Sequence, residues 1–234
     1  MTDADAGIRR LARIDLAALA GHLEAAVAAG ADLLDARADA YGHGLALVAP
    51  VARRAGVQRI AVSDERDAAV AAAAGWAATA VLVGRLTPPV PAAEVIGAEA
   101  WGLDGSSAPV LTLVGEVIAV KHVGADAGVS YGYTYRTAAP TVLALIGLGY
   151  ADGVPRLASN RVAVAVAGGP HPLVGRVAMD QFVVDCGDAL PEPGAEAVLF
   201  GRGAVPATAW AAATGRGALA LTAGLGRRIR RVSA

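Results

Sequence analysis

The sequence predicts a chain in two parts, an α/β part with a parallel sheet and then a β-rich part. Helix-like and strand-like segments alternate through roughly the first hundred residues. After Pro109, helix signals become scarce and short segments rich in β-branched residues take over. Alternating strands and helices are typical of parallel sheets joined by crossovers, whereas closely spaced strands favour an all-β fold. We therefore expect one domain over residues 1–106 and a second over residues 107–234.

Helix and strand signals follow one another regularly in the first part. Asp15 precedes an apolar stretch and is a suitable N-cap, and Ser63 stands in the same relation to a later stretch. Pro50 lies inside a helical pattern, where it predicts a kink or a late start. We predict helices over residues 15–30, 44–56 and 63–75, and strands over residues 31–40, 59–63 and 78–84. A Pro-rich linker is expected over residues 85–95.

The second part reads as a series of short strands with a single helix. The strand-like segments cover residues 110–123, 141–150, 161–169, 181–187 and 195–201. Residues 206–215 form the one helical pattern, and residues 219–232 close the chain. The segment "GIRRLARID" at residues 7–15 is a further strand, which we expect to pair into the β-rich domain.

Composition excludes several classes of function. The net charge is −1, and the short basic run "RRIRR" at residues 227–231 is best explained as the solvated face of a last strand, so we expect no nucleic-acid partner. The longest uncharged stretch is broken by Gly75, and the acidic N-terminus lacks the apolar core of a signal peptide, so we expect no membrane partner. Cys186 is the single cysteine, which fits a reducing compartment and a cytoplasmic protein.

Generic catalytic motifs are missing from the sequence. It has no glycine-rich dinucleotide or phosphate loop, and its four histidines are scattered without metal-ligand spacing. We therefore expect no metal site. Lys121 is the single lysine of the chain, and every other cationic side chain apart from the histidines is an arginine.

Five local strings carry a specific resemblance. They are "RADAYGHG" at residues 37–44, "VSYGYTYRTAAP" at 129–140, "GLGYADGVPR" at 147–156, "VGRVAMDQFVVD" at 174–185 and the ending "RRIRRV". In this order they resemble alanine racemase, a family of fold-type III enzymes that depend on pyridoxal 5'-phosphate. The resemblance covers most of residues 8–104 and 109–232. It implies a TIM-type β/α barrel, incomplete here, followed by a β-domain of the alanine racemase C-terminal type.

The family resemblance also implies the chemistry of the site. Family members hold the cofactor on a lysine in the motif Lys-Ala-Asp-Ala-Tyr-Gly-His-Gly, and a tyrosine from the partner subunit serves as the second base. Racemisation removes a proton from one face of the α-carbon and returns one to the other, so it needs two positioned groups. The cofactor supplies the electron sink, and the protein holds and orients it. The resemblance thus implies pyridoxal 5'-phosphate, a homodimer, a small amino-acid ligand and the interconversion of L- and D-alanine.

Six residues of this chain match functional positions of the family. Tyr150 matches the catalytic tyrosine, and Arg37 stands at the position of the lysine. The others are binding positions: Tyr41 matches a tyrosine that contacts the cofactor phosphate, Met179 and Asp180 match a pair near the substrate carboxylate, and Tyr131 matches a tyrosine near the site entrance.

Three departures from the family pattern bear on activity. The guanidinium of Arg37 stays protonated and forms no productive Schiff base at neutral pH. A complete barrel takes about 250 residues, and far fewer precede the β-rich part here. Leu219 stands where the family has a further tyrosine contacting phosphate.

These departures predict a degenerate, non-catalytic member of the family, a pseudoenzyme. Two alternatives stay open: an active alanine racemase or related amino-acid isomerase that works by a modified route, and an accessory subunit that lends Tyr150 to a complete racemase. Structural explanations of the matched residues also stay open, with Arg37 as an ion-paired residue at a strand end and Tyr150 packed in the β-domain. An incomplete barrel leaves open sheet edges, so we expect either that two copies close one barrel or that the strands form a small layered sheet.

Overall fold

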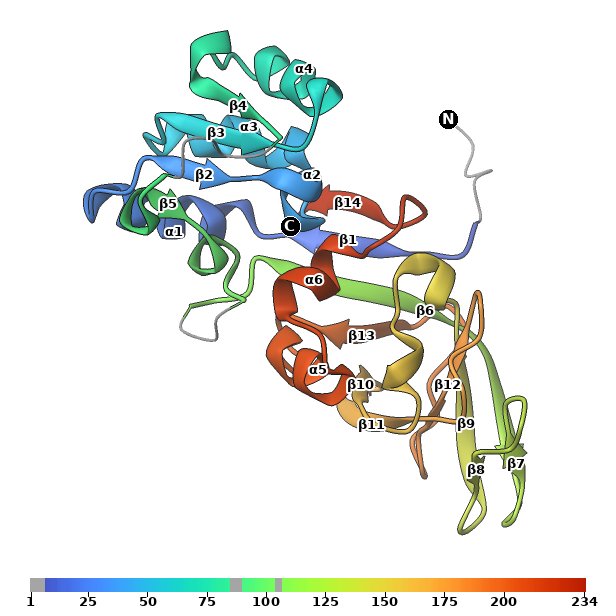
Figure 1. Ribbon diagram of the computed structural model, residues 1–234. Coiled ribbons are helices and arrows are strands. Elements are labelled where there is room, and N and C mark those ends of the chain that lie inside the picture. The colour runs from blue at the N-terminus through green and yellow to red at the C-terminus, as the bar shows by residue number, and fades with distance from the viewer. Residues whose placement is uncertain (1–6, 85–89, 104–106) are drawn as a thin grey trace. The chain divides into compact units, whose positions relative to one another are not determined.

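The computed structural model describes residues 7–84, 90–103 and 107–234 (Figure 1). The acidic N-terminal segment, part of the predicted linker and the predicted domain boundary at residue 106 lie outside the described residues. The chain divides into two compact units, and each takes segments from several parts of the sequence. The first unit comprises Met1–Ala12, Thr112–Arg216 and Leu225–Arg230, and the second comprises Arg13–Leu111, Gly217–Gly224 and Arg231–Ala234.

The second unit contains a four-stranded parallel sheet in the order β4-β3-β2-β5. Its strands are β2 (Leu33–Asp35), β3 (Arg59–Val62), β4 (Val81–Val83) and β5 (Val95–Ile96). The last of these strands in the sequence returns to pair with the first, as the final strand of a closed β/α barrel does. The predicted incomplete barrel is therefore confirmed, with its first strand flanked on both sides.

The helices α3 (Leu45–Arg54) and α4 (Glu65–Ala73) connect successive strands of this sheet, and α1 (Leu16–Ala28) precedes its first strand (Figure 1). The three helices pack against one another in turn. Asp15 caps α1 as predicted, because its side chain accepts a hydrogen bond of 2.8 Å from the backbone of Ala18. α3 begins before its proline, so the predicted late start is wrong.

The predicted cap of α4 is also wrong by one residue. The N-cap is Asp64, whose side chain accepts hydrogen bonds from the backbone N–H groups of Arg66 and Asp67. The hydroxyl of Ser63 instead accepts a hydrogen bond of 2.6 Å from the backbone of Ala38. Ser and Asp cap equally well, so only the position of the neighbouring chain decides between them.

Most strands of an eight-stranded sheet, in the order β13-β10-β11-β12-β9-β6-β1-β14, belong to the first unit. A further pairing of β13 with β6 closes six of these strands into a barrel-like ring. The strands are β1 (Leu11–Ile14), β6 (Leu111–Val123), β9 (Thr141–Ile146), β10 (Ala163–Val166), β11 (Gly169–Val174), β12 (Phe182–Asp185), β13 (Glu196–Phe200) and β14 (Arg230–Ser233). β1 lies between β6 and β14, so the prediction that residues 7–15 add a strand to this sheet is confirmed.

Shorter elements complete the two units. A hairpin of β7 (Gly128–Val129) and β8 (Tyr135–Arg136) stands beside the ring of strands. The helix α5 (Ala207–Thr214) was predicted, whereas α6 (Ala218–Ala223) was not. One-turn helices are α2 (Arg37–Tyr41), η1 (Ala78–Ala80), η2 (Ala92–Glu94), η3 (Ala98–Trp101), η4 (Tyr150–Asp152) and η5 (Arg156–Ala158).

Each unit has its own apolar core, made mainly of Val, Leu and Ala. In the first unit Trp210 and Phe200 are fully buried with ring centroids 5.7 Å apart, and the indole of Trp210 donates to Ala163 O. In the second unit Trp101 and Ile60 are fully buried. No helix among the described residues is long and apolar enough to span a bilayer.

A glycine at the end of α2 allows the tightest backbone approach in the second unit. Gly42 has φ +81°, and a Cβ there would lie 2.0 Å from the carbonyl oxygen of Thr222. Gly30, which follows α1, has φ +99° but nothing within 4 Å of its ideal Cβ.

We expect Gly42→Ala to lower the free energy of unfolding by more than about 3 kcal/mol, since it adds a backbone clash to the cost of a left-handed alanine. The matched variant Gly30→Ala meets only the conformational cost, about 1 kcal/mol. Urea unfolding measures both, and equal losses would contradict the close approach at Gly42.

Candidate functional site

A compact ion-paired cluster lies at the end of β2. Arg37 donates two hydrogen bonds to the carboxylate of Asp35, from Nε at 2.8 Å and from Nη2 at 2.6 Å. The hydroxyl of Tyr41 donates to the same carboxylate at 2.7 Å. Asp35 is buried, whereas the Arg37 side chain is 38% exposed. Paired, two-point contact of a guanidinium with a carboxylate is among the stronger hydrogen-bonding arrangements in proteins.

The contacts within this cluster fix its charges. Burial acts to raise the pKa of Asp35, but the hydrogen bonds from Arg37 and Tyr41 outweigh it and the pKa is lowered. Burial and the bond to Asp35 raise the pKa of the Tyr41 phenol to about 12. The hydrogen bond to Asp35 also raises the pKa of Arg37. At neutral pH the cluster therefore holds a carboxylate, a guanidinium and a neutral phenol.

The chain forms a left-handed turn directly after Arg37. Ala38, Asp39, Ala40 and Tyr41 have φ between +50° and +56°. Left-handed backbone costs a non-glycine residue roughly 1–2 kcal/mol, so four in succession persist only when the surroundings hold them. The predicted strand over residues 31–40 is wrong from this point, because the chain leaves β2 after three residues.

Side-chain hydrogen bonds hold the left-handed turn. The carboxylate of Asp39 accepts from the backbone of Leu45 at 2.8 Å, and Arg231 donates to Gly42 O at 3.0 Å. His43 Nδ1 lies 2.9 Å from Ala40 O and 3.1 Å from Tyr41 O. Both of these partners are acceptors, so His43 carries its proton on Nδ1.

His43 is fully buried against the indole of Trp101, with ring centroids 4.6 Å apart. Burial lowers the pKa of His43 from 6.5 to about 4. Among the described residues, His43 Nε2 and Trp101 Nε1 are the buried side-chain polar atoms without a hydrogen-bond partner. His43 is therefore neutral at pH 7 and serves the turn through Nδ1.

In the first unit the segment around Tyr150 is held by the loop that contains Met179. Tyr150 N donates to Ala178 O and Ala151 N donates to Met179 O, each at 3.0 Å. A Cβ at Gly149 would lie 2.2 Å from Met179 O, so the two segments meet at a distance that only glycine permits. Tyr150 and Met179 are both exposed, so the phenol projects from a fixed turn.

A buried carboxylate fixes the far side of this turn. Asp152 is fully buried and accepts from Gly149 N at 2.9 Å and from Arg228 Nε at 2.9 Å. Arg10 Nε lies 3.5 Å from the same carboxylate. Arg228 also donates to Asp180 at 2.6 Å. Asp180 is thus an ion-pair partner of Arg228 here, and Arg228 joins the loop to the Tyr150 turn.

Arg156 connects Tyr150 with Tyr131, and Arg176 makes a further contact with Tyr131. The guanidinium of Arg156 lies over the Tyr150 ring, 5.5 Å from its centroid, and donates to the Tyr131 hydroxyl at 3.0 Å. The guanidinium of Arg176 lies 5.4 Å from the centroid of Tyr131. Such contacts stabilise exposed aromatic rings in one orientation.

The structure therefore groups the predicted residues in two sets. Tyr131, Tyr150, Met179 and Asp180 are linked in the first unit, and Arg37 with Tyr41 forms the cluster in the second. Sequence reasoning missed the partners that organise both sets: Asp35, Asp152, Arg156, Arg176 and Arg228. All of these except Asp35 lie inside the five strings that carry the resemblance, which was the signal available for them.

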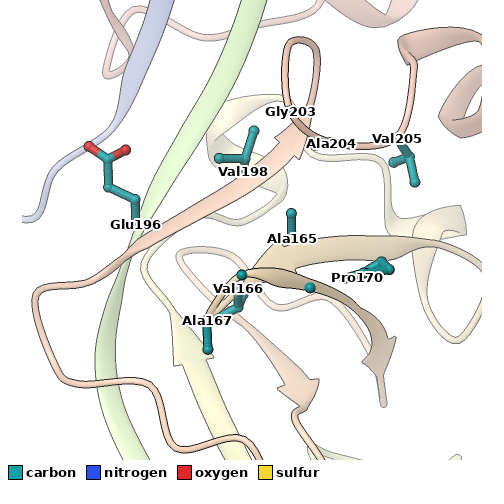
Figure 2. A pocket seen from close by; sticks show the side chains of 11 residues that line it. Ala165, Val166, Ala167, Pro170, Glu196, Val198, Gly203, Ala204 and Val205 are labelled. Atoms are coloured by element: carbon teal, nitrogen blue, oxygen red, sulfur yellow. The ribbon is translucent and has the colours of Figure 1, made fainter.

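A cavity of about 460 Å³ lies elsewhere in the first unit (Figure 2). It is formed by the β10–β11 hairpin, β13 and the loop at residues 203–205, and none of the predicted site residues lines it. Figure 2 shows Glu196 apart from the other labelled side chains, with its carboxylate turned away from them. The volume of a cavity alone therefore does not identify the candidate site in this protein. No group of His, Cys, Asp and Glu among the described residues could hold a metal ion.

Comparison with known proteins identifies the family. The family model "Alanine racemase, C-terminal domain" matches residues 110–233, which is more than half of the chain, and "Alanine racemase, N-terminal domain" matches residues 14–103. The chain belongs to the alanine racemase family.

Curated alanine racemases match part of the chain closely. The alanine racemase of Streptomyces coelicolor is 50% identical over 127 residues, which cover 53% of this chain and 32% of the relative. That of Thermobifida fusca is 46% identical over 127 residues, covering 53% of this chain and 34% of the relative. The matched region thus spans about a third of the length of these curated relatives.

Solved alanine racemase structures share the fold. The enzyme from Streptomyces coelicolor A3(2) aligns with a TM-score of 0.83 at 28% identity, covering 99% of this chain and 100% of that chain. The enzyme from the D-cycloserine producer Streptomyces lavendulae aligns with a TM-score of 0.84 at 24% identity, covering 98% of each chain. The predicted family and fold class are confirmed.

The alanine racemase family depends on pyridoxal 5'-phosphate, but the residues at the β2 end do not fit that cofactor. An aldehyde cofactor held through a Schiff base needs a primary amine, and Arg37 supplies a guanidinium that is occupied by Asp35. The hydroxyl of Tyr41 is occupied by the same carboxylate. Lys121, the single lysine, lies on β6 in the other unit.

The buried His43 makes the stability of this alanine racemase homologue depend on pH. Between pH 6.5 and about pH 4 the unfolded chain binds a proton that the folded chain does not. We expect the free energy of unfolding to be highest above this pH range. It should fall by on the order of 3 kcal/mol as the pH drops through the range. Urea titrations at several pH values measure this slope.

The variant His43→Asn keeps an N–H donor near the position of Nδ1 and removes the titrating group. We expect a flatter pH dependence in this variant than in the unaltered chain. An unaltered slope in His43→Asn would show that another group titrates.

Proposed function

We propose that this chain is an alanine racemase-like protein that does not catalyse racemisation with pyridoxal 5'-phosphate. The observation that carries the proposal is the closed cluster of Arg37, Asp35 and Tyr41. Where the resemblance calls for an amine and a free phenol, this chain has an ion pair and a phenol that already donates to it. Both groups stay protonated at neutral pH, because their pKa values are raised, so neither can act as a base.

The four-stranded parallel sheet supports the same proposal. A complete β/α barrel surrounds its site with loops from eight strands, and catalytic residues come from the ends of several of them. Here the sheet of the described residues has four strands, so half of the surrounding loops have no counterpart in it. The proposed domains are residues 1–106 for this barrel-like part and residues 107–234 for the β-domain.

The Tyr150 turn supports a retained binding role. Its phenol is exposed, and the arginines at positions 156 and 228 hold the turn on either side. We propose that this surface takes a small amino acid or a partner subunit, with Tyr131, Met179 and Asp180 beside it. We also place the protein in the cytoplasm, which subcellular fractionation would test.

Reductive labelling tests the loss of cofactor chemistry. The purified chain is mixed with pyridoxal 5'-phosphate, reduced with borohydride and mapped by mass spectrometry, and alanine racemisation is assayed in parallel. Lys121 and the N-terminal amine are the primary amines of the chain. We expect no stoichiometric adduct, no shift in the cofactor spectrum and no turnover.

Lys121→Gln is the control variant, since it removes the one lysine that could carry an adduct. A stoichiometric adduct on Lys121, with racemisation that this variant abolishes, would overturn the proposal and assign an active enzyme. Turnover that appears only after adding a full-length racemase with a mutated tyrosine would instead assign an accessory subunit that lends Tyr150.

We further propose that the chain forms a homodimer. The exposed aromatic and thioether side chains around Tyr150, with their arginine neighbours, have the composition found at the centres of protein interfaces. Light scattering should give twice the chain mass of 23.2 kDa. Tyr150→Asp should shift the mass towards one chain, because it places a charge at the proposed contact. A monomeric mass for the unaltered chain would contradict this proposal.

A further inference from the structure

The solvent face of the sheet formed by β6, β9 and β12 is unusually apolar. Residues that pair directly across antiparallel strands point to the same face. Lys121 pairs with Leu143, Ala119 pairs with Leu145, and Leu145 pairs with Val183, so these five residues share one face.

The opposite face of the same strands is the core of the first unit. Val142, Ala144, Ile146 and Val184 are buried there. Antiparallel sheets with one face in the core normally alternate apolar and polar residues along each strand. β9 breaks this alternation, because Leu143 and Leu145 stand on its outer face and are only partly buried.

A cavity of about 320 Å³ lies on this outer face. The five paired residues on this face line the cavity together with Val123. Residues 127–130, which include β7, also line it. The Tyr135 hydroxyl donates to the Asp185 carboxylate at 2.7 Å, which pins the β7–β8 hairpin to β12. The volume lies in the range of small-molecule pockets, which are mostly apolar with a few placed polar groups.

Among the described residues that line this cavity, Lys121 is the charged one. It is exposed, and among the described residues no carboxylate lies within ion-pair distance of it. Asp185 is the nearest acidic residue in the same row of paired positions, two strands away, and its oxygens accept hydrogen bonds from Tyr135 and Thr141. The cavity thus combines an apolar floor with one uncompensated positive charge.

We propose that this cavity binds an amphiphile with an unbranched apolar tail and a carboxylate head, of the medium-chain fatty acid class. The tail covers Leu143, Leu145 and Val183, and the head pairs with the ammonium of Lys121. The cavity in Figure 2 lacks such an anchor, since its charged residue Glu196 is acidic and pairs with Arg9 at 3.3 Å. The proposal is independent of the proposed function.

Calorimetric titration of the full chain with sodium decanoate, below its micellar concentration, tests the proposal. We expect one site per chain. Affinity should rise about fourfold for each methylene added from hexanoate to decanoate, because each buried methylene contributes a fixed free energy. Decan-1-ol, which keeps the tail and lacks the charge, should bind about tenfold more weakly.

Two variants distinguish the contribution of the carboxylate head to the affinity from that of the apolar tail. Lys121→Met keeps the apolar stem and removes the charge, so it should weaken decanoate about tenfold and leave decan-1-ol unchanged. Leu145→Gln should weaken both ligands. Val198→Gln makes the same kind of change at a partly buried strand residue in the cavity of Figure 2, and should change neither affinity.

Three results would overturn the proposal. One is equal affinity of the unaltered chain and Lys121→Met for decanoate. Another is loss of binding in Val198→Gln, which would place the ligand in the other cavity. The third is absence of decanoate binding together with a mass that falls from two chains to one in Leu145→Gln, which would assign this face to a second copy of the chain.

Discussion

The buried carboxylate of Asp152 is the interaction on which the first unit depends. It accepts hydrogen bonds from the backbone N–H of Gly149 in its own turn and from Arg228 near the end of the chain. It also forms an ion pair with Arg10 near the beginning of the chain. A carboxylate without solvent is stable only when such partners surround it, and the partners in turn have their positions fixed. Residues more than seventy positions apart are therefore tied to one point beside Tyr150.

The second unit uses a carboxylate in a different way. Asp35 stands at the end of a strand and accepts two side-chain hydrogen bonds from Arg37 and one from Tyr41. The left-handed turn that follows is strained in four successive residues, and its support comes from inside the chain through Asp39, His43 and a hydrogen bond from Arg231. The polar groups at this end of β2 thus bind one another.

The residues on the outer face of β6, β9 and β12 are not determined by the packing of the core. Its pairing register follows from the buried face, where Val142, Ala144 and Ile146 meet the core. Nothing in that requirement dictates leucine at positions 143 and 145 on the other side. Their apolar character, next to the single lysine of the chain, is a property that the family fold does not demand.

The sequence by itself determined the family, the positions of the matched residues and the change from helix-and-strand to strand-rich structure, because these depend on local spacing and on short strings. Asp15 was recognisable as a cap for this reason. Tertiary structure alone decided that Asp64 caps α4 in place of Ser63, since the Ser63 hydroxyl is taken by a backbone group from another turn. It also decided that Asp35, Asp152, Arg156 and Arg228 organise the candidate site. Hydrogen bonds between side chains distant in sequence have no local pattern, so only the folded chain reveals which of its many arginines and carboxylates meet.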